Sequence, residues 1–236
     1  MYGLPSQTKV DLLQSLQRTV ELGADRAAIF GYAHVPDMIP RQRVIDDNAL
    51  PDQATRFAMA SDAFEYMTTH GYAAIGFDHF ALRGFDPLSV TAAKGKLRRN
   101  FQGFTDDTAP ILIGLGSSAI SSFPHLLAQN EKNSGRYRMM ISQDQLTVSR
   151  GIRRSADDQL RGQIIESLLC QGKANVPPSI LAEITASLAP FIERELAEVS
   201  NGELEILAEG LPYARTIAAL FDPYRRQSQR RFSSAV

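Results

Sequence analysis

Two adjacent side chains with acid–base chemistry, Asp78 and His79, follow a short apolar stretch of the sequence. Ile75 and Phe77 favour a buried strand, and this strand is predicted to end where the polar pair begins. In α/β proteins, functional groups collect at the carboxyl ends of parallel strands. The pair is therefore a candidate site, although a capping aspartate beside a turn histidine would give the same pattern.

A cationic and polar segment follows further along the chain. It reads Arg98-Arg99-Asn100-Phe101-Gln102-Gly103. Guanidinium and amide groups bind oxyanions in a directed way, so the segment is a candidate clamp for a carboxylate or phosphate. A solvated loop is the structural alternative.

Histidines and glycines suggest two further kinds of site. His34, Asp78 and His79 would form a two-histidine, one-carboxylate metal set if their strand ends adjoined, but the sequence shows no second shell to orient them. The segment from Gly114 to Ala119 fits G-x-G-x-x-A, the local form of a dinucleotide fingerprint. Pro124 interrupts the helix that should follow, so the wider pattern fails. What remains is backbone that a polar small molecule could approach closely.

Alternating helix and strand patterns must position these residues. In the first half, helices are expected over 9–22, after the N-cap Thr8, and over 52–70, with strands over 26–30 and 110–114. The inner faces of these two helices are expected to carry Val10, Leu13, Leu16 and Val20 in the first, and Phe57, Ala60, Phe64 and Met67 in the second. From residue 151 the pattern becomes largely helical, with helices over 156–169, 178–199 and 213–224 and a hairpin strand over 203–209.

Composition narrows the class of protein. The chain has 236 residues, 44% of them hydrophobic and 22% charged, with a net charge of −1. These values are typical of a folded globular protein and argue against nucleic acid or an anionic membrane as a partner. No membrane span or signal peptide is recognisable, and one cysteine suits a reducing compartment, so a cytoplasmic protein is expected. The basic run from Arg225 to Arg231 is interpreted as a frayed tail rather than a nucleic-acid contact.

Taken together, several segments resemble the C-terminal half of bacterial oxygen-independent coproporphyrinogen III oxidase (coproporphyrinogen dehydrogenase). The matching segments are Tyr2-Gly3-Leu4-Pro5, Tyr32-Ala33-His34-Val35-Pro36, Gly76-Phe77-Asp78-His79-Phe80-Ala81, Arg99-Asn100-Phe101-Gln102-Gly103, Gly114-Leu115-Gly116, Ser118-Ala119-Ile120-Ser121, Gln129-Asn130, Arg150-Gly151 and Phe221-Asp222-Pro223-Tyr224. They extend over essentially the whole chain, so no single motif carries the resemblance.

The resemblance implies an α/β fold and a radical S-adenosylmethionine chemistry. Residues 1–150 would form the C-terminal strands of a partial radical-SAM (β/α) barrel, and residues 151–236 a small, mostly helical, winged-helix-like module. Such enzymes use a [4Fe-4S] cluster and S-adenosyl-L-methionine to decarboxylate two propionates of coproporphyrinogen III oxidatively, which gives protoporphyrinogen IX in haem biosynthesis. Ala33 and Ile120 fall at S-adenosylmethionine contacts of the family. The substrate carries four carboxylates, which suits a pocket of His34, Asp78, His79, Arg98, Arg99, Asn100 and Gln102.

The chain also departs from the family pattern. The family holds its cluster with a C-x-x-x-C-x-x-C motif in its N-terminal half, whereas Cys170 is the one cysteine here. Phe104 replaces a tyrosine usual in the family. We therefore expect a truncated form that is inactive alone and binds no metal. Two alternatives remain open: one half of a split enzyme whose partner chain supplies the cluster half, or a non-catalytic protein that binds porphyrin or S-adenosylmethionine.

Overall fold

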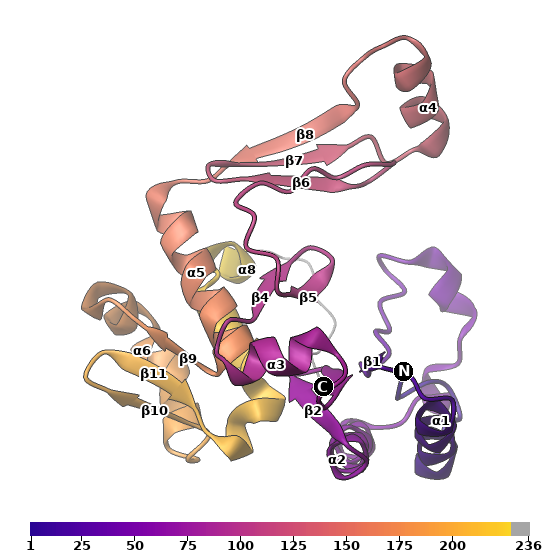
Figure 1. Cartoon of the computed structure of the whole chain (residues 1–236), viewed down its shortest axis with the longest axis vertical. Coiled ribbons are helices and arrows are strands. Elements are labelled where there is room, and N and C mark those ends of the chain that lie inside the picture. The colour runs from indigo at the N-terminus through magenta and orange to yellow at the C-terminus, as the bar shows by residue number, and fades with distance from the viewer. Residues whose placement is uncertain (228–236) are drawn as a thin grey trace.

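A computed structural model describes residues 1–227 of the chain. The first part is a small antiparallel sheet covered by two helices (Figure 1). The sheet has the order β1-β3-β2, with β3 paired antiparallel to both neighbours. Its elements are α1 (Lys9–Glu21), β1 (Arg26–Ala28), α2 (Gln53–Thr69), β2 (Tyr72–Ile75) and β3 (His79–Leu82), with short 3-10 helices η1 (Pro40–Val44) and η2 (Asp47–Ala49) between β1 and α2.

Mixed α/β structure was expected, but the expected parallel neighbours are not found among these named strands. Because the chain reverses at Gly76, which has a φ of +62°, β3 returns beside β2 and separates it from β1. A parallel pairing is present as an isolated bridge between Tyr2 and Gly31. Residues 1–227 thus form no closed barrel.

The two helices begin where predicted and present some, but not all, of the predicted residues to the core. Thr8 caps α1 in a capping box with Asp11, and Asp52 caps α2. The expected inner face of α1 is wrong at Val10, which is 61% exposed.

The buried stripe of each helix was predicted in part: Leu16 and Met67 are buried, and Val20 and Ala60 pack against the same core. Leu12 and Leu16 are the buried residues of α1, and Leu13 is exposed. In α2 the buried residues are Met59, Ala63 and Met67, whereas Phe57 and Phe64 lie beside this stripe. Sequence spacing fixed the period of these helices, and packing against the sheet chose the phase.

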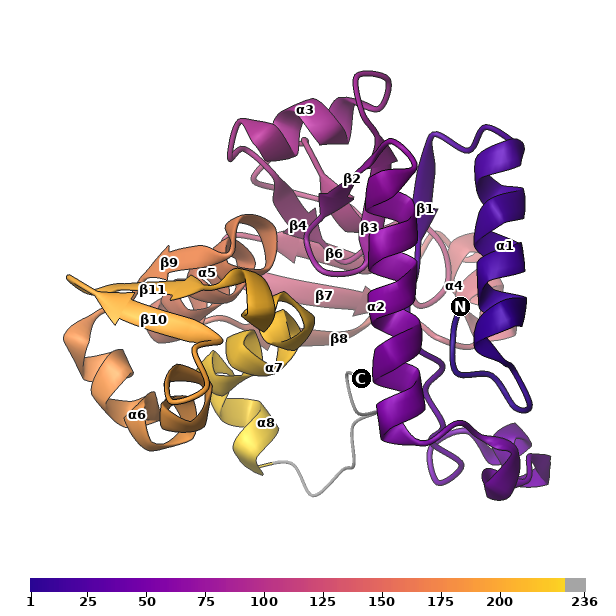
Figure 2. The ribbon, with the colours of Figure 1, turned by 90° about the horizontal axis from the view of Figure 1, so that it is seen from below.

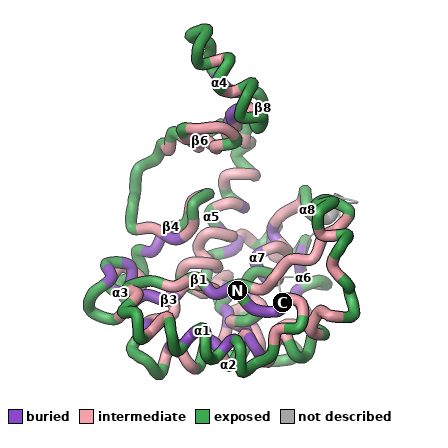
Figure 3. Tube along the Cα trace, turned by 90° about the vertical axis from the view of Figure 1, so that its right-hand side faces the viewer, coloured by how far each residue is buried: buried purple, intermediate pink, exposed green. Residues whose placement is uncertain are grey.

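The middle of the chain contains two further antiparallel sheets. A hairpin pairs β4 with β5, and a sheet of order β6-β7-β8 projects away from the body of the molecule (Figures 1 and 3). The predicted strand over 110–114 is wrong; only Leu112 pairs there, in an isolated bridge to Ser122. The elements are α3 (Pro87–Ala93), β4 (Arg98–Asn100), β5 (Gly103–Thr105), β6 (Ile120–Phe123), β7 (Leu126–Asn130), α4 (Ser134–Ser142) and β8 (Val148–Arg153).

The C-terminal part packs helices on a three-stranded antiparallel sheet of order β10-β11-β9. The predicted strand over 203–209 is confirmed over Glu203–Ile206, but the predicted helix over 178–199 ends at Ile192 and β10 follows. The elements are α5 (Ala156–Gln171), β9 (Lys173–Asn175), α6 (Pro178–Ile192), β10 (Ala197–Ser200), β11 (Glu203–Ile206), η3 (Ala208–Tyr213), α7 (Ala214–Ala218), η4 (Ala219–Phe221) and α8 (Pro223–Gln227). Their apolar residues form one core, and Phe77 from the β2–β3 turn packs against it.

Two predictions do not coincide with the observed elements or with the described residues. The predicted boundary after residue 150 falls inside β8, and the basic run that ends at Arg231 extends beyond the described residues. No helix within residues 1–227 is long and apolar enough to cross a membrane.

Candidate functional site

The β2–β3 turn, which carries Asp78 and His79, is packed against the β4–β5 hairpin. A methyl group added at Gly76 would overlap the ring of Phe104, so glycine permits both the turn conformation and the close approach of the two hairpins. Phe104 lies edge-to-face with Phe77 and with His79, at centroid distances of 5.8 and 5.2 Å. Asp78 thus lies in a tight turn and His79 begins β3, beside an aromatic cluster, and neither lies at the carboxyl end of a parallel strand as predicted.

Asp78 and His79 form a hydrogen-bonded pair. Asp78 Oδ1 lies 2.6 Å from His79 Nδ1, and both side chains are largely buried. The main-chain oxygen of Asp78 accepts a hydrogen bond from Ile29 N, which ties the turn to the chain just after β1. Within residues 1–227 no group hydrogen-bonds to His79 Nε2, which faces Gly103. A carboxylate that orients an imidazole leaves Nε2 able to donate to, or accept from, a ligand.

Arg99 brings a positive charge to the same cluster. Its guanidinium carbon lies 5.6 Å from the centroid of Phe77 and 5.4 Å from that of Phe104. Aromatic faces stabilise a cation without neutralising it, so the guanidinium keeps its donors for an oxyanion. Asp78, His79 and Arg99 are therefore brought together by the fold.

Arg98 and the polar residues after Arg99 have other partners. Arg98 Nε lies 2.7 Å from Glu166 Oε1 in α5, and the same oxygen accepts the backbone N–H of Arg99. This ion pair raises the pKa of Arg98 and directs its charge toward the C-terminal helices. Asn100 Oδ1 accepts the backbone N–H of Gln102 and shapes the hairpin turn, where Gln102 is exposed.

Ala33 and His34 lie in the loop after β1. Gln42 holds this loop, because its amide donates to the Ala33 carbonyl and accepts from Val35 N. His34 Nε2 lies 2.8 Å from Asp47 Oδ1, an ion-pair distance without the alignment of a hydrogen bond. The structure thus pairs His34 with Asp47, and the metal set with Asp78 and His79 is not assembled.

Ile120 lies in β6, in a different sheet from β1 and β3. Figure 1 shows β6 apart from β1, and Ala33 lies beyond β1, in the long connection that leads to α2. The loop before β6 is held by Asn130, whose Nδ2 donates to the carbonyls of Gly114 and Gly116.

The residues present do not fit an iron–sulfur cluster. Cys170 is the one thiol, and burial, reinforced by Glu166, raises its pKa to about 12, which disfavours the thiolate that a cluster requires. Within residues 1–227 there is no group of three or more histidine, cysteine, aspartate or glutamate side chains arranged to hold a metal ion.

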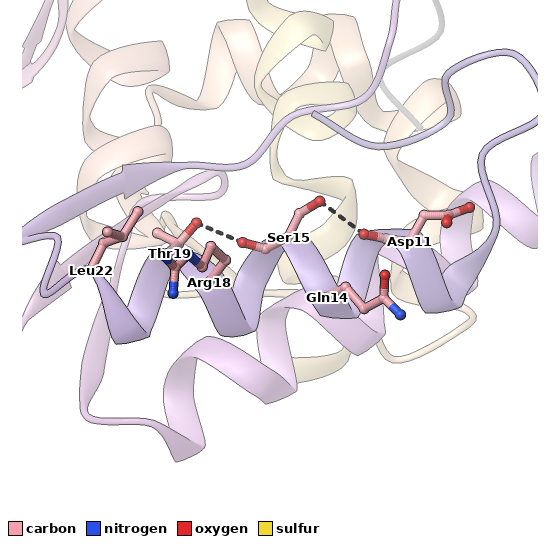
Figure 4. Close-up of a pocket in the computed structure, with 6 residues that line it drawn as sticks. All are labelled: Asp11, Gln14, Ser15, Arg18, Thr19 and Leu22. Carbon is pink, nitrogen blue, oxygen red and sulfur yellow. Dashed lines mark hydrogen bonds between the residues drawn. The ribbon is translucent and has the colours of Figure 1, made fainter.

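The exposed face of α1 forms a shallow hollow with several polar groups (Figure 4). The hydroxyl groups of Ser15 and Thr19 donate to the main-chain oxygens of Asp11 and Ser15 within the helix. These groups are satisfied locally and do not converge on a ligand position, so the hollow is not a candidate site.

Three residues near the cluster escaped the sequence-based prediction of the site: Phe77 as a cation platform, Glu166 as the partner of Arg98, and Arg215. The Arg215 guanidinium lies 5.4 Å from the centroid of Phe77. No motif marks Arg215, and only packing of α7 beside the β2–β3 turn brings it there. The family departure at Phe104 was noted from sequence, but its contact with Gly76 required the structure.

Comparison with known proteins places the chain among enzymes of one kind, although no family model matches it. It is 41% identical to an oxygen-independent coproporphyrinogen III oxidase of Cereibacter sphaeroides, which it matches over 98% of its own length and 53% of the relative. The corresponding protein of Bradyrhizobium diazoefficiens is 35% identical, with 100% of this chain and 54% of the relative covered.

A solved structure gives the same result. Coproporphyrinogen III oxidase from Escherichia coli, described as a radical SAM enzyme, matches with a TM-score of 0.86 and 34% identity, over 94% of this chain and 54% of that one. The chain spans about half the length of the curated relatives it matches. Over that half, the chain is a homologue of the oxygen-independent coproporphyrinogen III oxidases.

Proposed function

We propose that this chain acts in haem biosynthesis as the substrate-facing half of a coproporphyrinogen III oxidase. The observation that carries the proposal is the near-complete coverage of the chain by relatives of that name, at 35–41% identity. The reaction would be the oxidative decarboxylation of two propionates of coproporphyrinogen III to give protoporphyrinogen IX. The partial radical-SAM barrel and the winged-helix-like module belong to the same proposal, supported by the TM-score of 0.86.

The proposed role of the site is to bind substrate carboxylates. Arg99, supported on two aromatic rings, would receive one propionate, and His79 Nε2 would hydrogen-bond to the same or a neighbouring group. Asp78 would keep the imidazole in orientation. Asn100 and Gln102 lie in the adjacent hairpin turn, where their free amide groups can contact the rim of a large substrate. Because Arg98 is engaged by Glu166, Arg99 is the clamp cation.

Cofactor chemistry would need groups that this chain lacks. A single buried thiol cannot hold the [4Fe-4S] cluster of the family, so no step through it is assigned to these residues. Ala33 and Ile120 remain proposed S-adenosylmethionine contacts. Ala33 lies in the connection after β1 and Ile120 begins β6, so one ligand would contact both of these segments.

Substrate binding is tested by titrating the purified chain with coproporphyrin III, the stable oxidised form, and following the Soret band. We expect saturable binding that weakens about tenfold in Arg99→Gln, since a charge-assisted hydrogen bond is worth roughly 1.5–3 kcal/mol. Arg138→Gln, in the exposed helix α4, is the matched control. If neither substitution changes the affinity for porphyrin, Arg99 is not part of the binding site.

Cluster binding is tested by anaerobic reconstitution with iron and sulfide. The chain alone should retain no stoichiometric cluster; if it does, the assignment of cluster ligands to another polypeptide fails. In the split-enzyme alternative, co-expression with a chain carrying the cysteine motif should restore decarboxylation through a stable complex. A non-catalytic binder would bind porphyrin and gain no activity from such a partner.

A further inference from the structure

A second hollow of the molecule lies where the first sheet meets the C-terminal part. A cavity of about 300 Å³ opens between α2, the β2–β3 turn and the η3–α7 segment, which run beside one another in Figure 2. Its walls are mostly apolar and include Phe30, Phe57, Phe64, Phe80, Leu211 and Pro212. Phe57 and Phe64 are the α2 residues that lie beside the buried stripe, so this face of α2 has a wall of aromatic rings. A volume of this size is at the small end of ligand pockets.

Four polar side chains line the same cavity: Tyr2, Ser61, Asp78 and Arg215. Burial raises the pKa of the Tyr2 phenol, and the charges of Arg56, Arg215 and Asp78 act on it as smaller causes. Asp78 is hydrogen-bonded to His79. Within residues 1–227, the side chain of Arg215 makes no ion pair or hydrogen bond, and its guanidinium lies over the ring of Phe77.

An apolar cavity with one guanidinium that has no ion-pair partner is complementary to a ligand that has apolar rings and an anionic group. Rings of a ligand would replace water against the phenylalanine walls, and an anionic group would receive the parallel N–H donors of Arg215. We propose that this cavity binds a small aromatic or alicyclic carboxylic acid, with its ring in the cavity and its carboxylate on Arg215. The cavity shares Phe77 and Asp78 with the proposed clamp but includes neither His79 nor Arg99, so its anion would bind a different cation.

Asp78 predicts the direction in which the affinity for an acid should change. Its carboxylate lines the cavity and repels a second anion, so replacing it by a neutral isostere should strengthen binding of an acid and leave a neutral analogue unaffected. A cavity that is merely apolar would bind the acid and its neutral analogue alike, and the substitution would change neither affinity.

The absence of tryptophan makes the measurement direct. Indole-3-propionate is the probe and indole-3-propanamide its neutral control, both followed by indole fluorescence anisotropy with the full chain. We expect the acid to bind about tenfold more tightly than the amide. Equal affinities, or no binding of the acid, would overturn the proposal without any variant being needed.

Substitutions then locate the probe. Arg215→Leu should abolish the preference for the acid, whereas Arg194→Leu, an exposed arginine of the same part of the chain, should preserve it. Asp78→Asn should tighten the acid only, and Ala60→Leu, which fills the cavity, should weaken both probes. Unchanged acid binding in Arg215→Leu and Ala60→Leu would place the probe elsewhere and refute the site. Such a failure leaves the porphyrin titration of Arg99→Gln untouched, so the two proposals fail independently.

Discussion

The β1–β3 sheet and the β6–β8 sheet have the same size and the same antiparallel pairing, yet they are held together differently. In the first, α1 and α2 cover one face, and Tyr72, Ile75 and Phe80 are buried. In the second, all six residues of β8 are exposed. Its strands pair through their backbones, and the Asn130 side chain donates hydrogen bonds to Gly114 and Gly116 in the loop before β6.

The difference bears directly on the candidate residues. Asp78 and His79 lie on a sheet that apolar burial fixes, so their geometry is set within this chain. Ile120 lies on a sheet without such cover, and its position depends on a network of polar contacts. The Asp78–His79–Arg99 group is therefore the candidate site whose geometry the packing of this chain fixes.

The largest expected effect on stability comes from removing an apolar side chain of the first sheet, compared with the same change in the second sheet. Phe80→Ala should lower the free energy of unfolding by about 3–5 kcal/mol, because the ring is almost fully buried between α2 and the sheet. Ile152→Ala in β8 should change it by less than about 1 kcal/mol, since Ile152 is 66% exposed. Urea denaturation of both variants measures this. Similar losses would show that the second sheet is buried in solution.

Glycines provide a matched pair of backbone positions. Gly76→Ala combines a left-handed backbone with overlap on Phe104 and should cost about 2–4 kcal/mol. Gly151→Ala in β8 meets only ordinary contacts and should be neutral or stabilising by up to about 1 kcal/mol. Adding Phe104→Ala to Gly76→Ala should recover part of the interaction energy. A double variant whose losses simply add would contradict the close contact.

Polar contacts should matter most in the exposed sheet. Asn130→Ala leaves the carbonyls of Gly114 and Gly116 without their buried donor, and we expect a loss of about 1–3 kcal/mol. Asn48→Ala, an exposed turn asparagine, is the control with an expected loss near zero. Amide hydrogen exchange should report the loss locally, in the loop before β6. Unchanged protection there would mean that Asn130 does not hold the loop.

The smallest effect concerns an ion pair at the base of the first sheet. Hydrogen bonds from Arg26 lower the pKa of the buried Asp86, which also caps α3. A lowered folded-state pKa stabilises the protein above the ordinary aspartate value near pH 4, and this contribution disappears as the pH falls through the folded pKa.

Asp86→Asn should therefore cost about 0.5–1 kcal/mol at pH 7, a modest value because Arg26 is partly exposed, and nothing at pH 2. Urea midpoints at the two pH values measure this difference, with the exposed Asp37→Asn as the control. A loss of equal size at both pH values would assign the effect to the cap rather than to the charge.

Much of the local structure follows from the sequence. The caps Thr8 and Asp52, the helices they begin, and the strand at Glu203–Ile206 were predictable, because capping and periodicity are properties of neighbouring residues. The family resemblance was also available, since it rests on short motifs spread over the chain. The strand predicted over 110–114 failed because an apolar run does not specify a partner strand.

Only the tertiary structure decided which candidates meet. It placed Asp78 in a tight turn and His79 at the start of β3, in an antiparallel sheet, because Gly76 turns the chain against Phe104. It assigned Arg98 to Glu166 and left Arg99 on two aromatic rings. It added Arg215, which no motif marks. The sequence by itself determined the local elements and the kinship; the site depended on long-range packing, where residues far apart in the chain share one aromatic cluster.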